Sequence, residues 1–578
     1  MKFTAIICLL FLSLFSLAAC AGEELAEPLP SPIPTVLPTA ISTSLPDDAT
    51  TGASIRARGY LLVGVCYDLQ PFGYITDDGE VAGFGIDIGR ELARRWLGDD
   101  QAVKFRQVRT DTAIEHLQSG DVDIVISALA HTQPREAGAD FSLPYFVDGR
   151  ALLVRAADTD IIQDSASLEG RPVGVADREV EHTLRGTSPF TLAIKTYDRF
   201  DGAVAALGRG EVVAVADARR RLFWGKRLLL DAEGAKEGIE TAIVGQYTAT
   251  PLAFAFPQND PFFADLVTLT FQDMLSDGAY ADVYARWFAP EAPPTVERWP
   301  GEETLALADA PITTDVPDTI AAIQTRGRLA VAFVSDRAPF AYTDANGAPT
   351  GYEIDLARLA AERWLGSGSA VDFTPMALEA GKESVCTGQA DLLLGGLAHS
   401  RSAEMELDFS LTTYVAGEGL LVRTGAVITD LLSLNGRQVA VVEGSGSRES
   451  LLAAAQNAGV SLTVFPRPTL EAAVTSLQEE GVAAVAGERV ALLKVAHFAP
   501  ELDVLPLRLT RVPLALGLPP GDSAFRDLVN LTLQTMKGEG LLDTLYSAWF
   551  NDAPPSMLAW PGAPYRTLRL DVAPSPED

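Results

Sequence analysis

The sequence predicts an α/β protein that contains two tandem copies of one domain. Two observations support this: a pattern that returns at constant spacing, and short apolar strands that alternate with amphipathic helices. The triplet Asp-Phe-Ser at 140–142 returns at 408–410, an offset of 268 residues. The same offset carries Gly83 to Gly351, Asp87 to Asp355, Trp96 to Trp364 and Gly120 to Gly388. At 578 residues the chain has room for two domains of about 240 residues each.

Each copy opens with a short apolar strand, at 61–65 and at 329–333. Asp78-Gly79 and Asn346-Gly347 follow these strands, and such dipeptides favour tight hairpin turns. The next segment of each copy has apolar residues at helical spacing: Ile88, Leu92 and Trp96 in the first copy, and Leu356, Ala360 and Trp364 in the second. We therefore predict helices that end at Gly98 and Gly366 and that bury their tryptophans in the core.

Further short strands follow a helix in each copy, at 122–126 and 391–394. Strand, helix and strand in this order predict mostly parallel pairing. A second set of such units has strands at 173–175 and 214–216 in the first copy, and at 439–441 and 484–486 in the second. The chain after each copy also matches, because Trp-Pro-Gly stands at both 299–301 and 560–562.

The N-terminus has the features of a secretory signal. Lys2 precedes an apolar run at 6–17 that is short for a bilayer-spanning helix. The following Leu-Ala-Ala-Cys, ending at Cys20, resembles the lipobox of bacterial lipoproteins. The resemblance implies a lipoprotein signal at 1–20 that is cleaved before Cys20, so that the lipidated Cys20 becomes the new N-terminus and attaches the protein to a membrane surface; a plain signal and an uncleaved anchor are the alternatives. The proline-rich stretch 21–54 is predicted to be an extended tether.

Charge and cysteine content exclude several classes of function. A formal net charge of −32 argues against nucleic-acid binding, which needs clustered Lys and Arg. Cys66 and Cys386 lie at non-equivalent points of the two copies, so we interpret them as buried free thiols, with a disulfide between the domains as the alternative. The five histidines and the few cysteines show no metal-binding spacing. We predict no metal and no cofactor.

The ordered motifs resemble the bacterial extracellular solute-binding proteins of family 3, which bind polar amino acids for ABC transporters. The stretches 127–145 and 395–414 carry this resemblance: an apolar strand ends in small or hydroxyl residues, and Asp-Phe-Ser follows. The resemblance implies two tandem periplasmic-binding-protein type II domains, each with two α/β lobes joined by a hinge. Their implied bounds are 55–290 and 323–552, with a linker at 291–322 and a tail at 553–578.

In this family an Arg and an Asp from opposite lobes hold the carboxylate and the ammonium of a free amino acid. The resemblance implies that Arg135 and Thr132 bind the carboxylate and that Asp217 binds the ammonium. It also assigns Ser127 and Phe72 to the cleft, whereas Leu69 stands where an aromatic residue is usual. Asp177-Arg178-Glu179 replaces the family's Gly-Ser or Gly-Thr turn, so Arg178 is expected to offset two acids near the ligand.

The second copy inverts this pattern. It keeps the turn as Gly444-Ser445, the hydroxyl as Ser400 and the aromatic as Phe340. Ala403 replaces the Arg, and Gly487 replaces the Asp. We therefore expect the second cleft to bind a different ligand or to serve as a docking module.

The expected function is that of a non-enzymatic, extracytoplasmic, lipid-anchored receptor that captures an amino acid or a similar small polar solute for an ABC permease. A sensor module that signals through a separate transducer is one alternative. An enzyme similar to cyclohexadienyl dehydratase is another, with Glu179 or His131 as the acid or base. His131 and His399 occupy equivalent places, and without a nucleophile or metal partner we interpret both as packing residues.

Overall fold

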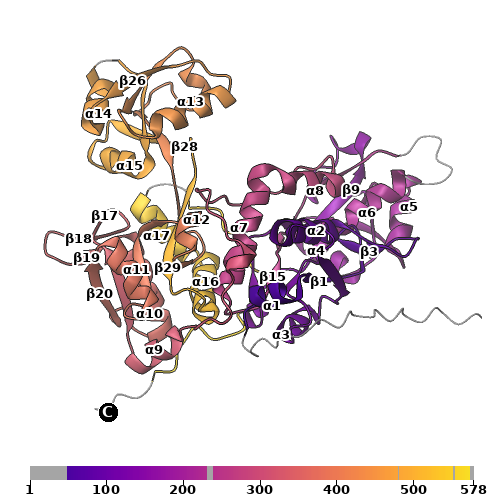
Figure 1. Cartoon of the computed structure of the whole chain (residues 1–578). Helices are drawn as coiled ribbons and strands as arrows, with labels where there is room; N and C mark the ends of the chain where they lie inside the picture. Colours follow the sequence, from indigo (N-terminus) through magenta and orange to yellow (C-terminus); the bar gives the residue numbers. More distant parts are fainter. Residues whose placement is uncertain (1–48, 231–238, 480, 551–553, 573–578) are drawn as a thin grey trace, which may run out of the picture. The chain divides into compact units, whose positions relative to one another are not determined.

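The computed structural model describes residues 49–230, 239–479, 481–550 and 554–572 (Figure 1). The predicted signal peptide with Cys20 and nearly all of the predicted tether lie outside the described residues. Within the described ranges, no helix combines the length and the apolar character that crossing a bilayer requires.

The first copy, called repeat one below, has two lobes, each with its own five-stranded sheet. The sheet of lobe one has the order β5-β1-β6-β15-β7, and the sheet of lobe two has the order β11-β10-β12-β9-β13. β1 pairs in parallel with β5 and β6, and β10 pairs in parallel with β11 and β12, as predicted. β15 and β9 pair antiparallel with their neighbours, so each sheet is mixed.

Lobe one of repeat one consists of α1 (Thr51–Arg58), β1 (Leu61–Val65), β2 (Asp68–Leu69), β3 (Gly73–Ile75), β4 (Val81–Ala82), α2 (Phe84–Leu97), β5 (Val103–Gln107), α3 (Ala113–Gln118), β6 (Ile124–Val125), η1 (Gln133–Ala137), β7 (Asp140–Phe141), β8 (Phe146–Asp148), β14 (Thr250–Leu252), β15 (Ala255–Phe256), α7 (Pro261–Asp277) and α8 (Ala279–Phe288). Lobe two consists of β9 (Arg150–Arg155), η2 (Ala156–Asp158), η3 (Ala166–Leu168), β10 (Pro172–Val175), α4 (Arg178–Thr187), β11 (Ala193–Thr196), α5 (Phe200–Gly208), β12 (Ala214–Ala218), α6 (Arg219–Leu230) and β13 (Thr241–Val244).

The second copy, called repeat two, has the same plan. Its lobe-one sheet has the order β20-β16-β21-β29-β22 with β23 beside β29, and its lobe-two sheet has the order β26-β25-β27-β24-β28. Between the repeats lies η4 (Leu307–Asp309). Lobe one consists of α9 (Thr319–Arg326), β16 (Leu329–Val334), β17 (Asp336–Arg337), β18 (Ala341–Thr343), β19 (Pro349–Thr350), α10 (Tyr352–Leu365), β20 (Val371–Met376), α11 (Leu378–Cys386), β21 (Leu392–Ala398), α12 (Arg401–Glu404), β22 (Asp408–Phe409), β23 (Tyr414–Ala416), β29 (Val512–Leu518), α16 (Ser523–Gly538) and α17 (Leu541–Phe550). Lobe two consists of β24 (Glu418–Arg423), η5 (Leu432–Leu434), β25 (Gln438–Val442), α13 (Ser447–Asn457), β26 (Thr463–Arg467), α14 (Leu470–Glu479), β27 (Ala484–Glu488), α15 (Arg489–Phe498) and β28 (Leu502–Arg508).

The two lobes of each repeat are joined where the outgoing and returning chains cross closely. A Cβ atom on Gly149 would lie 1.9 Å from the Thr248 carbonyl oxygen, and one on Gly417 would lie 2.3 Å from the Thr510 carbonyl oxygen. The hydroxyls of these two threonines accept the backbone N–H of the residue after each glycine, at 2.7 and 2.9 Å. In repeat two, Figure 1 shows β28 and β29 on the return path between the lobes. The crossing therefore needs glycine, and the same crossing is built twice.

The predicted helix ends and turns are confirmed. Gly98 and Gly366 end α2 and α10 in the left-handed region, at φ 78° and 77°. Gly79 and Gly347 have φ 82° and 83° in the turns that join β3 to β4 and β18 to β19. Positive φ is accessible to glycine at little steric cost, which explains why these residues stop the elements.

The first helix of each repeat begins earlier than the expected domain bounds. α1 starts at Thr51, inside the stretch predicted as tether, and α9 starts at Thr319, inside the predicted linker. Their first turns are held alike: the Thr51 N–H donates to Asp260 at 2.7 Å, and the Thr319 N–H donates to Asp522 at 2.8 Å.

Of the two tryptophans predicted for the core, Trp364 is buried in it and Trp96 packs against it. Trp364 is 1% exposed and donates its indole N–H to the Thr532 hydroxyl at 2.9 Å. Trp96 is partly buried against the core of repeat one and donates to Thr270 at 2.8 Å.

The two thiols differ from each other. Cys66 is buried and Cys386 is exposed, and both are free, so the prediction of a buried thiol is wrong for Cys386.

Thr532→Val is expected to destabilise repeat two by about 1–2 kcal/mol, because it leaves the buried Trp364 N–H without an acceptor while nearly conserving volume. Urea unfolding monitored by tryptophan fluorescence measures the change. Thr270→Val, at the less buried Trp96, serves as the matched variant and should cost less. Equal stability of Thr532→Val and the parent would contradict a role for this hydrogen bond.

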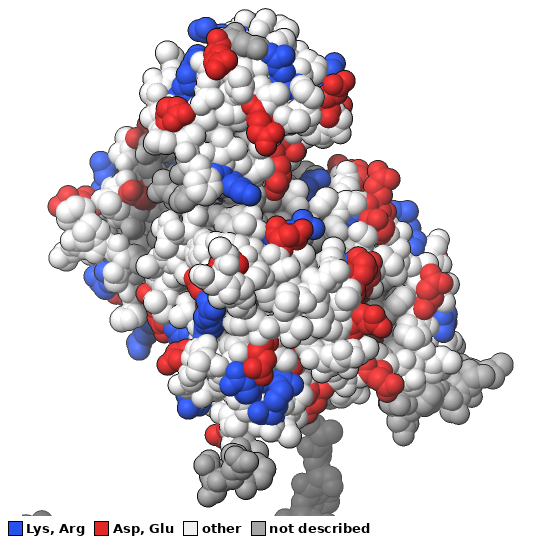
Figure 2. Space-filling model, turned by 90° about the vertical axis from the view of Figure 1, so that its left-hand side faces the viewer, with Lys and Arg blue, Asp and Glu red and all other residues white. Residues whose placement is uncertain are grey.

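Charged residues of both signs occur together on the surface. On the face shown in Figure 2, acidic and basic side chains lie interspersed among uncharged ones. This distribution offers no continuous basic surface on that face for a phosphate backbone.

Candidate functional site

The carboxyl ends of β1 and β6 meet in lobe one of repeat one. The Cys66 N–H, directly after β1, donates to the Ser127 hydroxyl at 2.6 Å. Ser127 is 1% exposed, so this hydroxyl ties the two strand ends together. Ligands of open α/β sheets bind outside the carboxyl ends of the strands, and this edge is therefore the candidate binding face of the lobe.

Arg135 lies in η1 and reaches back to this edge. Its guanidinium donates to the Ala130 carbonyl at 2.7 Å and to the Thr110 carbonyl at 3.1 Å. Partial burial lowers the pKa of Arg135 from its usual value, yet an arginine remains charged. Two of its five N–H groups make these bonds, so the others are available to a ligand carboxylate. Thr132, partly exposed, directly precedes η1.

Asp217 lies in β12, in lobe two. It is 1% exposed, accepts the Ala218 N–H at 2.7 Å and pairs with Arg221 at 3.0 Å. Burial raises the pKa of Asp217, and the charge of Arg221 opposes that shift. A buried carboxylate with a single side-chain partner is suited to receive a cation that replaces or joins that partner.

Two further residues lie near Asp217 that the motifs did not reveal. Arg150 pairs with Glu179 at 3.3 Å, and its charge acts on both Asp217 and Tyr247. The Tyr247 hydroxyl is buried and has no hydrogen-bond partner among the described residues. Burial raises the pKa of Tyr247, so it remains a neutral potential donor. The position of Arg150 directly after the hinge glycine was the signal in the sequence that could have indicated it.

The start of α4 explains the unusual Asp-Arg-Glu turn. Asp177 caps this helix and accepts the backbone N–H groups of Glu179 at 2.7 Å and Val180 at 3.2 Å. The chain's own carboxylate thus takes the place at the helix N-terminus where a ligand carboxylate would bind. Arg178 is exposed. In repeat one, Arg135 therefore remains the residue predicted to bind a ligand carboxylate.

The aromatic wall expected from Phe72 is not a cleft wall in this structure. Phe72 is 1% exposed and packs edge-on against Phe84 and Phe146, with ring centroids at 5.8 and 5.2 Å. Leu69 is partly buried against the same core. The Phe72 ring, expected to line the cleft, lies in the hydrophobic core of lobe one instead.

Arg135 and Asp217 are each satisfied within their own lobe. No hydrogen bond or ion pair among the described residues joins them. Their role as a pair across the cleft remains a prediction.

Repeat two has a hollow at its Gly-Ser turn. It has a volume of about 400 Å³ and is lined by Gly444 and Ser445, by the start of α13 with Arg448 and Glu449, and by Pro466. The Ser445 hydroxyl donates to the Val442 carbonyl at 2.7 Å. The N-cap residue of α13 is Gly446, which has no side chain to cap the helix, whereas Asp177 caps α4 with its carboxylate.

The other predicted residues of the second cleft have structural roles. Phe340 is 5% exposed and packs against Tyr414 with ring centroids 5.1 Å apart. The Ser400 hydroxyl caps α12 by accepting the Ala403 N–H at 3.2 Å. Next to it, Arg401 is 3% exposed and pairs with Asp273 of repeat one at 2.5 Å. The Arg401 side chain is thus engaged by repeat one, where it also donates to the Ser276 hydroxyl at 3.1 Å.

Where the two lobes of repeat two join, two acidic residues lie side by side. Glu418 stands where repeat one has Arg150, and it lies opposite Glu488 in the antiparallel pair of β24 and β27. Burial, followed by the charge of Glu418, raises the pKa of Glu488, whereas Arg337 lowers it. The surroundings of the second cleft therefore differ in charge from those of the first.

The two equivalent histidines lie between aromatic rings. His131 stacks on Phe141 at a centroid distance of 4.4 Å, and His399 stacks on Phe409 at 4.5 Å. Burial lowers the pKa of His131 to about 3, so its imidazole is neutral at physiological pH. These contacts agree with the packing interpretation.

Comparisons with known proteins agree with this architecture. The family model of the bacterial extracellular solute-binding proteins, family 3, matches residues 61–290 and again residues 329–552. The chain is similar to the ABC transporter glutamine-binding protein GlnH of Bacillus subtilis (strain 168), with 26% identity over 241 residues, which are 41% of this chain and 84% of that protein. It is similar to a glutamine-binding protein of Geobacillus stearothermophilus, with 33% identity over 175 residues, 30% of this chain and 65% of that protein.

A solved structure with similarity is that of an ancestral cationic amino acid solute binding protein, AncCDT-1. It is 27% identical, with a TM-score of 0.35, over 41% of this chain and the whole of that chain. Two separate matches to one family model confirm the predicted duplication and fold class. The chain belongs to the bacterial extracellular solute-binding proteins, family 3, as a tandem of two domains of that family.

Proposed function

We propose that repeat one captures a free amino acid or a similar small polar solute between its lobes and delivers it to an ABC permease. The observation that carries this proposal is the presence of one arginine and one aspartate on separate lobes of a family-3 domain, each beside strand ends. A zwitterion needs both charges when it leaves water. A solute that contacts both lobes favours the closed state over the open one.

The buried groups around these two residues support the assignment. Arg135 keeps N–H groups beyond its two carbonyl contacts, and Tyr247, near Asp217, has a hydroxyl that bonds to no other described residue. On closure the solute ammonium would compete with Arg221 for Asp217. The relatives named as glutamine-binding proteins support an amino acid as the solute class.

Repeat two is proposed not to bind the same zwitterion. It has Ala403 and Gly487 where repeat one has Arg135 and Asp217, and it has Glu418 where repeat one has Arg150. Its open helix start at Gly444-Ser445 suits an anionic group instead. One amino acid per chain is therefore the expected stoichiometry.

The location belongs to the same proposal. A lipid on Cys20 would hold the chain to the outer side of a membrane, and the proline-rich stretch 21–48 would separate repeat one from that surface.

A thermal-shift screen of the full chain against each standard amino acid tests the proposal. Ligand at about 100 times its Kd stabilises the native state by about 2.7 kcal/mol, which should raise the melting temperature of the binding unit. Absence of any shift across the set would contradict amino-acid binding. Turnover of prephenate or arogenate, measured in parallel, would support the dehydratase alternative instead.

A further inference from the structure

The segments that follow the two repeats make matching contacts with the opposite repeat. We define arm one as residues 297–301, after repeat one, and arm two as residues 558–562, after repeat two; both end in Trp-Pro-Gly. Each arm is fixed to the last long helix of its own repeat. In arm one the backbone N–H of Trp299 donates to the Gln272 side-chain oxygen at 3.1 Å, and the Gln272 side-chain amide donates to the Glu297 backbone carbonyl at 2.9 Å.

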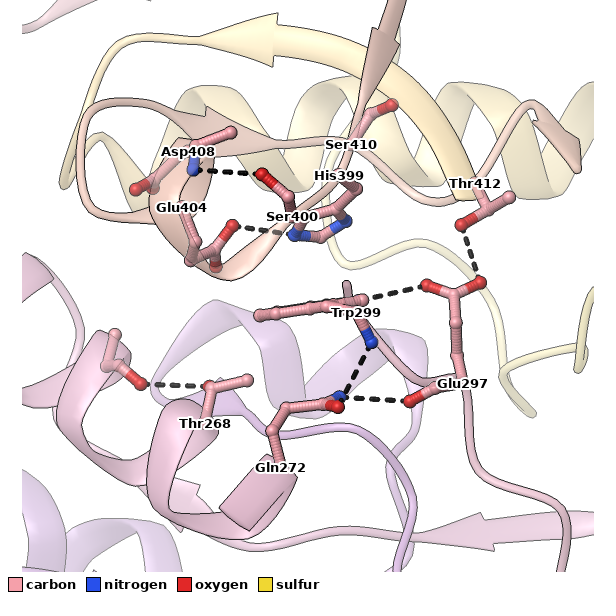
Figure 3. A network of polar contacts seen from close by, with 12 residues as sticks. Thr268, Gln272, Glu297, Trp299, His399, Ser400, Glu404, Asp408, Ser410 and Thr412 are labelled. Atoms are coloured by element: carbon pink, nitrogen blue, oxygen red, sulfur yellow. Dashed lines mark hydrogen bonds and ion pairs between the residues drawn. The ribbon is translucent and has the colours of Figure 1, made fainter. Parts of the chain in front are cut away.

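Arm one then contacts repeat two. The Trp299 ring stacks on His399, with centroids 3.8 Å apart and an interplanar angle of 30°. The Arg401 N–H donates to the Pro300 carbonyl at 3.0 Å, and the Thr412 hydroxyl donates to the Glu297 carboxylate at 2.7 Å. Figure 3 shows Trp299 lying against His399, with Gln272 and Glu297 beside it. His399 is thereby held between Trp299 and its own Phe409.

Arm two makes corresponding contacts with repeat one. The Trp560 ring stacks on His131, with centroids 4.2 Å apart and an angle of 29°. The Gln133 N–H donates to the Pro561 carbonyl at 3.0 Å. Within repeat two, the backbone N–H of Trp560 donates to the Gln534 side-chain oxygen at 3.3 Å, and the Gln534 side-chain amide donates to the Leu558 backbone carbonyl at 2.9 Å. Arm two therefore repeats the ring stacking, the backbone bond at the proline and the glutamine bonds of arm one, but it has Leu558 where arm one has Glu297.

Buried charges complete the contact between the repeats. Arg526 of repeat two pairs with Asp140 of repeat one at 2.6 Å and with Asp408 of its own repeat at 2.9 Å. Asp140 is 2% exposed and Asp408 is 5% exposed. The Ser523 hydroxyl also donates to Asp140, at 2.8 Å. Removing one partner of a buried ion pair is strongly destabilising. Separation of the two repeats would therefore leave Asp140 without its Arg526 partner.

The aromatic residues of both contacts are mostly removed from water. Trp299 and Trp560 are 6% and 8% exposed, and His131 and His399 are each 6% exposed. A tryptophan that left its histidine would expose both rings. The contact therefore shields two apolar surfaces that neither repeat covers by itself.

We propose that the two repeats form an intramolecular pair with approximate two-fold symmetry, in which each repeat is the docking partner of the other through a Trp-Pro-Gly arm received by a histidine. The partner of the docking surface around His131 is arm two of the same chain, and the partner of the surface around His399 is arm one. The two domains therefore unfold and diffuse as one unit. This inference does not depend on which solute is bound.

The double variant Trp299→Ala with Trp560→Ala tests the proposal in the full chain. Calorimetry of the parent is expected to show one transition, and the double variant is expected to show two, because the repeats then unfold separately. Small-angle scattering of the folded variant should give a larger radius of gyration than that of the parent. The control is Trp287→Ala with Trp549→Ala, whose indoles donate to Asp87 and Asp355 within their own repeats. The control should lower the melting temperature but keep one transition.

Hydrogen exchange of the parent keeps the test decisive if the double variant does not fold. The backbone N–H groups of Gln133 and Arg401 donate to the arms, so both should be protected in the parent. Two separate transitions in the parent, or exchange of these two amides at the rate of unstructured peptide, would overturn the proposal. A double variant with one transition and an unchanged radius of gyration would overturn it as well.

Discussion

Arg135→Ala is expected to weaken amino-acid binding by repeat one at least about 100-fold. A charge-assisted hydrogen bond contributes about 1.5–3 kcal/mol net, and the guanidinium can make two such bonds to one carboxylate. Because 1.4 kcal/mol corresponds to a tenfold change in Kd, loss of both bonds exceeds two orders of magnitude. Isothermal titration calorimetry with the amino acid found by the screen measures the change directly.

Two controls separate binding from folding in this experiment. Arg135 also donates to the Ala130 and Thr110 carbonyls, so the melting temperature without ligand must be recorded for the variant. Arg135→Lys keeps the charge but loses the fork, and we expect an intermediate affinity. Arg106→Ala removes an exposed arginine that pairs with Asp121 at 2.8 Å, and it should bind as the parent does. Parent-like affinity of Arg135→Ala would contradict the role assigned to this residue.

Glu353→Gln is expected to remove a pH dependence of about 3 kcal/mol from the stability of repeat two. Glu353 is fully buried, and burial raises its pKa to about 7 from an ordinary value of 4.5. The native state therefore holds a proton that the unfolded state releases above its own pKa. The stability contributed by this group is full below about pH 4.5, falls as the pH rises to about 7, and stays low above that value.

The substitution can keep the hydrogen bonds that Glu353 accepts, although the other oxygen, which is buried without a hydrogen-bond partner among the described residues, becomes an amide nitrogen. One carboxyl oxygen of Glu353 accepts the N–H groups of Gly395 at 2.7 Å and Gly396 at 3.0 Å, and the amide oxygen of Gln can accept both. Urea unfolding of parent and variant at pH 4.5 and pH 8 isolates the Glu353 contribution, because other buried carboxyls titrate in both proteins. Glu379→Gln, at an exposed site, controls for the charge change. Parallel pH profiles of parent and Glu353→Gln would contradict the raised pKa.

Local sequence predicted those parts of the fold that depend on a single repeat. The hairpin dipeptides, the helix-ending Gly98 and Gly366 and the core position of Trp364 all follow from backbone conformation or periodicity within a few residues. The duplication itself was visible as a constant offset. These features need no knowledge of what lies across the molecule.

The features that the sequence did not reveal depend on contacts between distant segments. Phe72 was assigned to a cleft wall because nothing local indicates that four aromatic residues surround it. Arg178 was expected to offset the charges of Asp177 and Glu179, whereas the Asp177 carboxylate accepts backbone N–H groups at the N-terminus of α4. The matching Trp-Pro-Gly tails were noticed, but their histidine partners lie in the opposite repeat.

The stoichiometry of solute binding tests the central claim most directly. Calorimetric titration of the full chain with the amino acid found by the screen should give one site per chain, because only repeat one carries both Arg135 and Asp217. Asp217→Ala should abolish that site, whereas Ser400→Ala in repeat two should leave it unchanged. Two equivalent sites, or one site that survives Asp217→Ala and disappears with Ser400→Ala, would contradict the account.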